Sequence, residues 1–442
     1  MKRTANLIVQ HLLWRGFYFF SVLILNILIS RFFAAEKSGQ IFYIINNLAF
    51  VLLLASISLE SGAAFYISSG KMDAVRMARF CLLWTIIAGG LAGLGWWLGL
   101  RFTHSTFFGT TGFLGASLLF IGGVLLTSFF NALFYSKQQF GLPNKLLLGV
   151  NICLIILLIL GRQTPGIRDH FILLYFISYA VQGVLLMVSF FISYPEKTGR
   201  GFPPSGVLAK AIRYSLIALT ANIIYFLVNR MDYWFVAHYC SARDLGNYIQ
   251  ASKLGQMLLI VPSILGATLF PLLSSGKHVN SSTELKSVVR VLLWINLGIC
   301  IPLICFGNYL LPLIFGKSFD EMYILFILLI PGILSLTANY PVAAWFSARE
   351  RIRVNISGAL ISMLLIIAGD VILLPYAGVR AASCVSSAGY FCYYCYMQAI
   401  YRKENPSSIK DFLFIRKNDL KWIYQLMKSK FSGMFPEKPI AP

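Results

Sequence analysis

Apolar runs of about twenty residues recur along almost the whole of this chain, separated by short segments that carry lysine, arginine, glycine or proline. A helix that spans a bilayer needs about 20 mostly apolar residues. The runs are apolar on every face, for example at residues 146–160, whereas the strands of a membrane barrel would alternate. About twelve transmembrane helices are therefore predicted, at 8–33, 41–67, 79–100, 112–135, 145–161, 170–193, 211–237, 247–271, 289–313, 322–346, 354–374 and 380–400.

The composition leaves no room for a sizeable soluble domain. Of the 442 residues, 58% are apolar and only 12% are charged. Twelve spans would take up roughly 240 positions and leave about 200 for loops and ends. The first run is interrupted at Arg15 and lacks a cleavage site of the secretory type, so an uncleaved first span is predicted. Cys392 and Cys395 form a CxxC inside an aromatic helix, which favours packing over redox or metal chemistry.

The net charge of +21 would suggest nucleic acid in a soluble protein, but the membrane explains it here. With the amino end in the cytosol, 26 of the 37 lysines and arginines fall on the cytosolic side and eight on the outer side. Cytosolic loops of membrane proteins carry such an excess. Both ends are therefore predicted to lie in the cytosol, in a multi-pass membrane protein that binds no nucleic acid.

Short sequence matches recur in unchanged order at offsets between 206 and 211 residues. Gly39 corresponds to Gly246, Trp84 to Trp294 and Gly109 to Gly316. A constant offset predicts an internal repeat of two six-helix lobes, which an even number of spans inserts with the same orientation. The predicted domains are an N-terminal lobe at 1–195, a cytosolic linker at 196–209, a C-terminal lobe at 210–401 and a basic tail at 402–442. Leu420, Ile423, Leu426 or Met427, and Phe431 have the spacing of an amphipathic helix on the lipid surface, although a solvated tail fits the sequence as well.

Ionisable residues inside the predicted spans are the candidates for function. A charge at the centre of a spanning helix costs about 2.5 to 3.5 kcal/mol on insertion scales, so it normally faces a cavity or a partner. The candidates are Arg15, Glu60, Arg230, Asp232, Lys253 and Asp370. Polar residues share a helix face with several of them: Tyr18 and Asn26 in the first span, Asn222, Tyr225 and Asn229 in the seventh, and Gln250 and Gln256 in the eighth.

One interpretation of these residues is a water-filled cavity between the lobes, in which Arg15, Arg230 and Lys253 attract an anionic substrate. The other interpretation is structural: polar pairing between helices, or side chains that reach the membrane interface. No metalloprotease, Walker A or serine hydrolase motif is present, and every outer loop is short. Transport is therefore favoured over catalysis, with no cofactor.

Residues 1–401 resemble the polysaccharide transporter family, which contains the oligosaccharide (O-antigen) flippases, in the multidrug, oligosaccharidyl-lipid and polysaccharide exporter superfamily. The resemblance rests on Arg230-x-Asp232, Ala242-Arg-Asp-Leu-Gly-Asn-Tyr248, Phe270-Pro271, Ile314-Phe-Gly316 and Leu374-Pro-Tyr-Ala-Gly-Val-Arg-Ala-Ala382. The last resembles the family pattern IPxYGxxGAA, with Ala377 inserted and Arg380 where glycine is usual.

The resemblance implies a protein of a bacterial inner membrane that works by alternating access. Two lobes rock about a cationic cavity and move an undecaprenyl-diphosphate-linked oligosaccharide from the cytosolic to the periplasmic leaflet. A diphosphate requires Arg and Lys, and a sugar requires Tyr, Asn and Gln. The predicted substrate site comprises Arg15, Tyr18, Asn26, Asn229, Arg230, Lys253 and Gln256. By analogy with the sodium site of the related lipid II flippase, Asn222, Asp232 and Asp370 are predicted to bind a coupling cation, Na+ or H+. The alternatives are a multidrug and cation antiporter of the same superfamily, and a membrane glycan polymerase or ligase.

Overall fold

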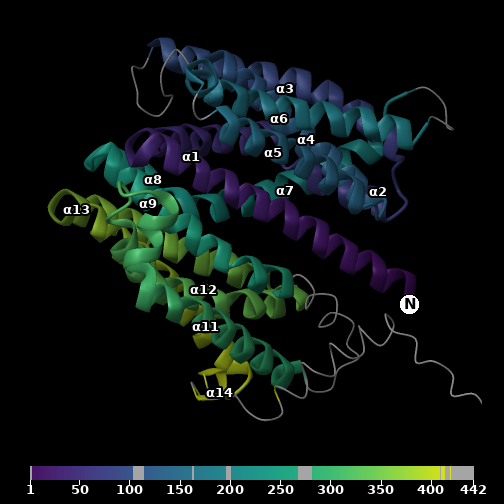
Figure 1. Ribbon diagram of the computed structural model, residues 1–442. Helices are drawn as coiled ribbons and strands as arrows, with labels where there is room; N and C mark the ends of the chain where they lie inside the picture. The colour runs from purple at the N-terminus through teal and green to yellow at the C-terminus, as the bar shows by residue number, and fades with distance from the viewer. Residues whose placement is uncertain are drawn as a thin grey trace, which may run out of the picture. The chain divides into compact units, whose positions relative to one another are not determined.

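The computed structural model describes residues 2–102, 114–161, 164–195, 201–266, 281–408, 410–413 and 419, and the described residues form helices and turns without a strand (Figure 1). The all-helical prediction is thus confirmed. In the first half the helices are α1 (Lys2–Ser56), α2 (Leu59–Ser68), α3 (Ala74–Phe102), α4 (Leu114–Ser136), α5 (Gly141–Leu160), α6 (Pro165–Ser193) and α7 (Ser205–Arg230). The second half holds α8 (Asp232–Tyr239), α9 (Ala242–Leu258), α11 (Ser281–Phe315), α12 (Met322–Ala348), α13 (Ile352–Glu404) and α14 (Lys410–Leu413).

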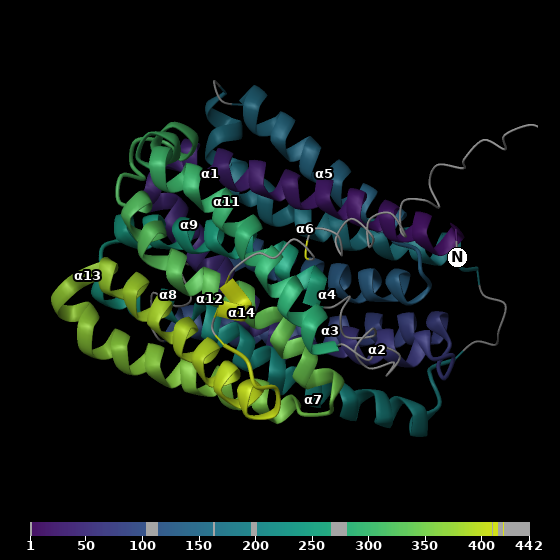
Figure 2. The ribbon, with the colours of Figure 1, turned by 90° about the horizontal axis from the view of Figure 1, so that it is seen from below.

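Ten helical segments of the described chain are long and apolar enough to cross a membrane. Two of them contain a break. Helix α1 leaves helical geometry at Ala34 (φ 56°), and α13 does so at Gly378 (φ 61°). The two halves of α13 pack on each other, because a side chain on Gly369 would meet Val385 (Figure 2). At 1.5 Å per residue each half of α13 is about 39 Å long, enough for a crossing of its own. When the two broken segments, α1 and α13, are each counted as two crossings, the ten segments agree with the prediction of about twelve.

The contacts divide the chain into two units. Unit 1 contains residues 1–32 and 43–223, and unit 2 contains residues 33–42 and 224–442. The predicted domain boundaries at 195 and 210 stay a prediction. The part of the tail that carries the predicted amphipathic pattern, from Leu420 onward, lies outside the described residues.

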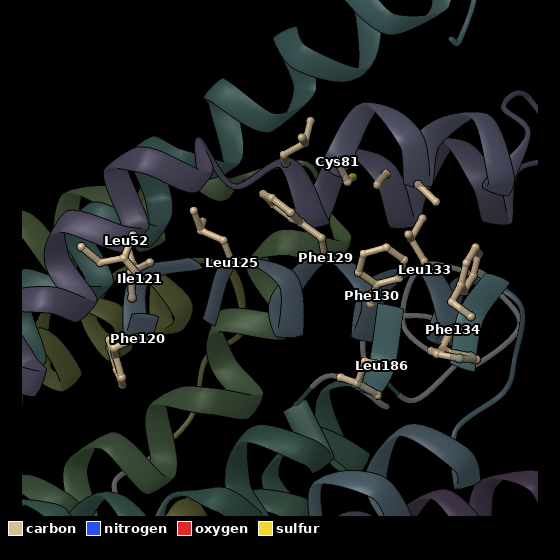
Figure 3. Close-up of a cluster of buried hydrophobic side chains, with 14 of the residues drawn as sticks. Leu52, Cys81, Phe120, Ile121, Leu125, Phe129, Phe130, Leu133, Phe134 and Leu186 are labelled. Carbon is tan, nitrogen blue, oxygen red and sulfur yellow. The ribbon is translucent and has the colours of Figure 1, made fainter. Parts of the chain in front are cut away.

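Unit 1 is built around α4, which packs against α3 and α6. Phe129, Phe130 and Phe134 of α4 are fully buried in a cluster of aliphatic and aromatic side chains (Figure 3). The rings of Phe130 and Phe134 meet Phe190 of α6 edge to face at 5.6 and 5.3 Å. Small residues let the two helices approach: a Cβ on Gly123 would lie 2.4 Å from the backbone of Tyr179 and Ala180. Such close crossings are typical of helices packed in a membrane.

Unit 2 includes a short piece of α1. The backbone N–H of Ala35 donates to Ser318 Oγ at 3.0 Å, and Gly39 lies against Gly246 at the start of α9. These two glycines are the pair that the sequence repeat had equated. On the same side, Arg380 donates to both carboxylate oxygens of Glu321, at 3.0 Å each. Arg380, which stands where the family pattern has glycine, is therefore paired with Glu321, the residue just before α12.

Candidate functional site

A buried carboxylate stands where α7 ends and α8 begins. Met231 interrupts the helix, and Asp232 follows as the first residue of α8, 1% exposed. Its Oδ1 accepts from the backbone N–H of Tyr233 at 2.9 Å, and its Oδ2 accepts from Ser386 Oγ at 3.0 Å and from the Tyr248 hydroxyl. The carboxylate of Asp232 is thus held by α8, α9 and α13 through neutral donors.

A polar network continues from this carboxylate along α9. The Tyr233 hydroxyl donates to Ser252 Oγ at 3.0 Å. Gln256 Nε2 donates to Ser252 Oγ at 3.3 Å and to the Asn229 carbonyl at 3.4 Å. Buried hydroxyl and amide groups that bond one another resist rearrangement, because each would lose a partner in a medium without water. Two residues of the predicted substrate site, Asn229 and Gln256, therefore belong to one network with Asp232.

Two cations lie close to this network. The guanidinium of Arg230 is 5.5 Å from the centre of the Phe226 ring, and the ammonium of Lys253 is 3.2 Å from that of Phe42. The two cations lie within electrostatic range of each other. In the described part of unit 2, no hydrogen bond or ion pair joins Arg230 to Asp232 or to another carboxylate. Two like charges held together in a membrane protein are stabilised when an anion binds between them.

The second buried carboxylate, Asp370, differs from the first. It lies in α13, is 0% exposed, and neither of its oxygens has a hydrogen-bond partner in the described structure. The Asp370 carboxyl is within electrostatic range of Asp232. Ser383, also in α13 and 0% exposed, has an Oγ without a hydrogen-bond partner in the described structure. An ionised carboxyl without a partner is costly inside a protein, so a proton or a bound cation is needed to balance Asp370.

The remaining predicted residues lie in unit 1. Arg15 lies 5.5 Å from the Phe19 ring and within electrostatic range of Tyr18 and Tyr135. Asn26 uses its amide locally, donating to the Val22 carbonyl at 2.8 Å. Asn222 donates to Ser58 Oγ at 3.0 Å, next to a break of the second span where Ile57 and Ser58 both have positive φ. The structure thus brings Asn229, Arg230, Lys253, Gln256, Asp232 and Asp370 together in unit 2, whereas Arg15, Tyr18, Asn26 and Asn222 belong to unit 1.

Sequence reasoning missed the hydroxyl groups that hold Asp232. Tyr248 stands at the end of the Ala242-to-Tyr248 segment that carried the family resemblance, so a signal for it was present. Ser386 lies in a run of small residues with no distinguishing pattern. Its role depends on the packing of α13 against α8 and α9.

Comparison with known proteins now adds to this geometry. A family model described as "Polysaccharide biosynthesis protein" matches residues 175–324. No curated protein matches the chain significantly in sequence. The lipid II flippase MurJ, in an inward closed conformation, has a TM-score of 0.68 at 16% identity, over 96% of this chain and 95% of its own.

An inward-facing multidrug resistance MATE transporter of the MOP superfamily has a TM-score of 0.65 at 11% identity, over 88% of this chain and 96% of its own. The chain has the fold of the MOP-superfamily transporters. A MOP-superfamily transporter from Pyrococcus furiosus, whose binding pocket is described as having reverse polarity, aligns with a TM-score of 0.59 at 12% identity, over 91% of this chain and 95% of its own. The family model thus supports the resemblance stated from the sequence over residues 175–324, and the solved structures confirm the fold that it implied.

Proposed function

We propose that this multi-pass membrane protein is a flippase that moves an undecaprenyl-diphosphate-linked oligosaccharide from the cytosolic to the periplasmic leaflet by alternating access, for surface polysaccharide synthesis such as that of O-antigen. The match to a polysaccharide biosynthesis family and the likeness to a lipid II flippase support this function. The observation that carries it is the pair of neighbouring cations, Arg230 and Lys253, of which Arg230 has no carboxylate partner in the described structure.

In this proposal each residue has a chemical task. Arg230 and Lys253 in unit 2, and Arg15 in unit 1, neutralise the diphosphate. Tyr18, Asn26, Asn229 and Gln256 provide the hydroxyl and amide groups that a sugar binds. Hydrogen bonds to charged groups contribute about 1.5–3 kcal/mol each, so the loss of one cation is expected to weaken binding roughly 10- to 150-fold.

The test removes one charge at a time. Arg230→Gln, Lys253→Gln and Arg15→Gln are expressed in a strain that lacks the native copy, with Arg353→Gln as the matched control, because Arg353 is an exposed arginine in the first turn of α13. We expect the three variants to lose most of the surface glycan at normal membrane levels, and the control to keep it. Normal glycan in all three variants would contradict the proposal.

We further propose that Asp232 and Asp370 bind the coupling cation, Na+ or H+, with hydroxyl groups of α13 as additional ligands. Buried Asp370 supports this, because both its oxygens lack a partner in the described structure. A ligand that binds only the folded state raises the melting temperature. We expect NaCl to raise the melting temperature of the purified wild type over choline chloride, and to have no such effect on Asp370→Asn. An equal response of both would exclude a sodium site that depends on Asp370.

Asn222, the third predicted cation ligand, is tested separately. Its Nδ2 donates to Ser58, so only its amide oxygen is available to a cation. Asn222→Asp keeps this oxygen, and Asn222→Leu removes it. The proposal expects Asn222→Leu to reduce the response to the coupling ion and Asn222→Asp to preserve it. If Asn222→Leu and Asn222→Asp respond equally to the coupling ion, Asn222 is not a ligand and the cation site consists of unit 2 residues alone.

Drug export is the alternative suggested by the MATE folds and by the two buried carboxylates. A cationic drug would bind Asp232 and Asp370 rather than the arginines. Resistance to cationic dyes that depends on Asp370, together with normal surface glycan in the Arg230→Gln strain, would favour that function over flipping.

A further inference from the structure

The chain after α13 turns back into unit 2. Helix α14 packs against α11, and Phe412 is 0% exposed within a cluster that includes Leu285 and Val289. The Phe412 ring meets Tyr401 edge to face at 5.8 Å, and Tyr401 in turn meets Trp345 at 4.9 Å. Phe412 thus anchors the described part of the tail in the protein core, while residues 405–408 are half-buried or exposed.

An ion pair fixes the same segment further along. Asp419 is 1% exposed and Arg290, in α11, is 2% exposed. Arg290 Nε donates to Asp419 Oδ2 at 2.7 Å, and Nη2 donates to Asp419 Oδ1. Ser287 Oγ donates to Asp419 Oδ1 as well, and Arg290 Nη1 donates to the Asp411 carbonyl. Both charges therefore have several partners, and the bidentate geometry fixes the position of Asp419 relative to α11.

This arrangement explains why an arginine can be buried at that place in α11. A buried guanidinium without a carboxylate would be strongly unfavourable, and its partner lies 129 residues further along the chain. Asp411 and Asp419 are acidic residues within a segment that is otherwise rich in lysine and arginine. A tail held only by attraction to anionic lipid would not need them.

We propose that the described residues after α13, at 405–408, 410–413 and 419, form a clasp that holds together the neighbouring ends of α11, α12 and α13, so that these three helices move as one body. Phe412 joins the clasp to α12 and α13 through Tyr401 and Trp345, and Asp419 joins it to α11 through Arg290.

The test is a double-mutant cycle in the full-length protein. Arg290→Ala and Asp419→Ala are compared with Arg353→Ala, which replaces an exposed arginine in the first turn of α13. Hydrogen exchange of the backbone amides at 405–419 reports opening of the clasp. We expect exchange to accelerate at least about tenfold in either single variant, because one buried charge loses its partner, and not in the control. The reversed pair, Arg290→Asp with Asp419→Arg, should restore slow exchange.

A second measurement tests the mechanical role. Spin labels at Thr283 and Arg353, both exposed, report the distance between the ends of α11 and α13, in a background without the eight native cysteines. The distance distribution should be narrow with the native pair, broad in Asp419→Ala, and narrow again with the reversed pair. Exchange in Asp419→Ala that equals that of the Arg353→Ala control, together with a distance distribution that equals that of the native pair, would overturn the proposal. Fast exchange with an unchanged distance distribution would overturn the claim that the clasp couples the three helices.

Discussion

Gly39 and Gly246 pack so closely that a single added methyl group should open this contact in unit 2. A Cβ on Gly246 would lie 2.0 Å from the carbonyl oxygen of Ala35 and 2.7 Å from its carbon, and one on Gly39 would lie 2.7 Å from Gly246 Cα. Carbon atoms in contact are normally about 3.5–4.0 Å apart. The obstacle is backbone on both sides, so no side chain can rotate away. Gly246→Ala should therefore force residues 35–39 away from α9.

The magnitude follows from the cost of overpacking. Extra methyl groups in a packed interior cost about 1–3 kcal/mol, and each 1.4 kcal/mol changes an equilibrium tenfold. If unit 2 has a conformation in which this contact is open, Gly246→Ala should raise the population of that conformation roughly 5- to 150-fold. The bond from the Ala35 N–H to Ser318 Oγ should open together with it.

A buried thiol reports this opening. Ser38, 0% exposed and next to Gly39, is replaced by cysteine in a background without the native cysteines, and the rate of maleimide labelling is measured in detergent. Gly246→Ala should accelerate labelling at least about tenfold. Gly298→Ala is the control, because a Cβ there meets nothing within 4 Å. Equal labelling rates in the two alanine variants, with both proteins folded, would refute the reasoning.

Two further predictions concern packing and charge. In unit 1, Gly123→Ala should lower the melting temperature, because its Cβ would lie 2.4 Å from the α6 backbone, at a cost of about 1–3 kcal/mol. Gly122→Ala is the control and should not lower it, because the space around Gly122 is open. Equal melting curves for the two variants would show that α4 and α6 separate freely. Cys240 lies between the predicted spans. Burial, and then the carboxylates of Asp244 and Asp370, raise the pKa of its thiol to about 11. Alkylation of Cys240 at pH 8 should therefore be slow, and its rate should increase about tenfold per pH unit up to that pKa. Asp370→Asn removes one of these charges and should increase the rate at pH 8, and an unchanged rate would mean that Asp370 carries no charge there.

The sequence predicted the spans because hydropathy alone determines them. It also predicted the turn in the Leu374-to-Ala382 segment, where Gly378 adopts the positive φ that glycine tolerates best. The break at Ala34 falls between the predicted spans 8–33 and 41–67, although no glycine marks it. The break at Ile57–Ser58 lies inside the predicted span 41–67 and has no signal, since isoleucine and serine rarely adopt positive φ. Tertiary contacts impose these conformations: Ser318 binds the chain beside Ala34, and Asn222 binds Ser58.

The candidate site was predictable in composition but not in its pairing. Charged residues within apolar runs identified Arg230, Asp232, Lys253 and Asp370, because charge in a membrane is costly wherever it points. Partners depend on which helices pack, so neither the hydroxyls around Asp232 nor the Arg290–Asp419 pair could be predicted from the sequence. Arg290 stands at the start of the predicted span 289–313, and the structure buries it in α11.

Whether Arg230 and Asp232 form an ion pair decides between a structural and a functional role for both residues. Two residues apart in sequence, they would serve stability if they formed an ion pair, but Asp232 accepts from Tyr233, Tyr248 and Ser386 instead. A double-mutant cycle with Arg230→Ala and Asp232→Asn, measured as the change in unfolding free energy, should therefore give a coupling of less than about 0.5 kcal/mol, as independent sites do. A buried ion pair would give a coupling well above that value, since removing either partner would strand the other charge. Near-zero coupling in stability, together with loss of flipping in each single variant, is the result that only separate binding of an anionic substrate and a cation explains.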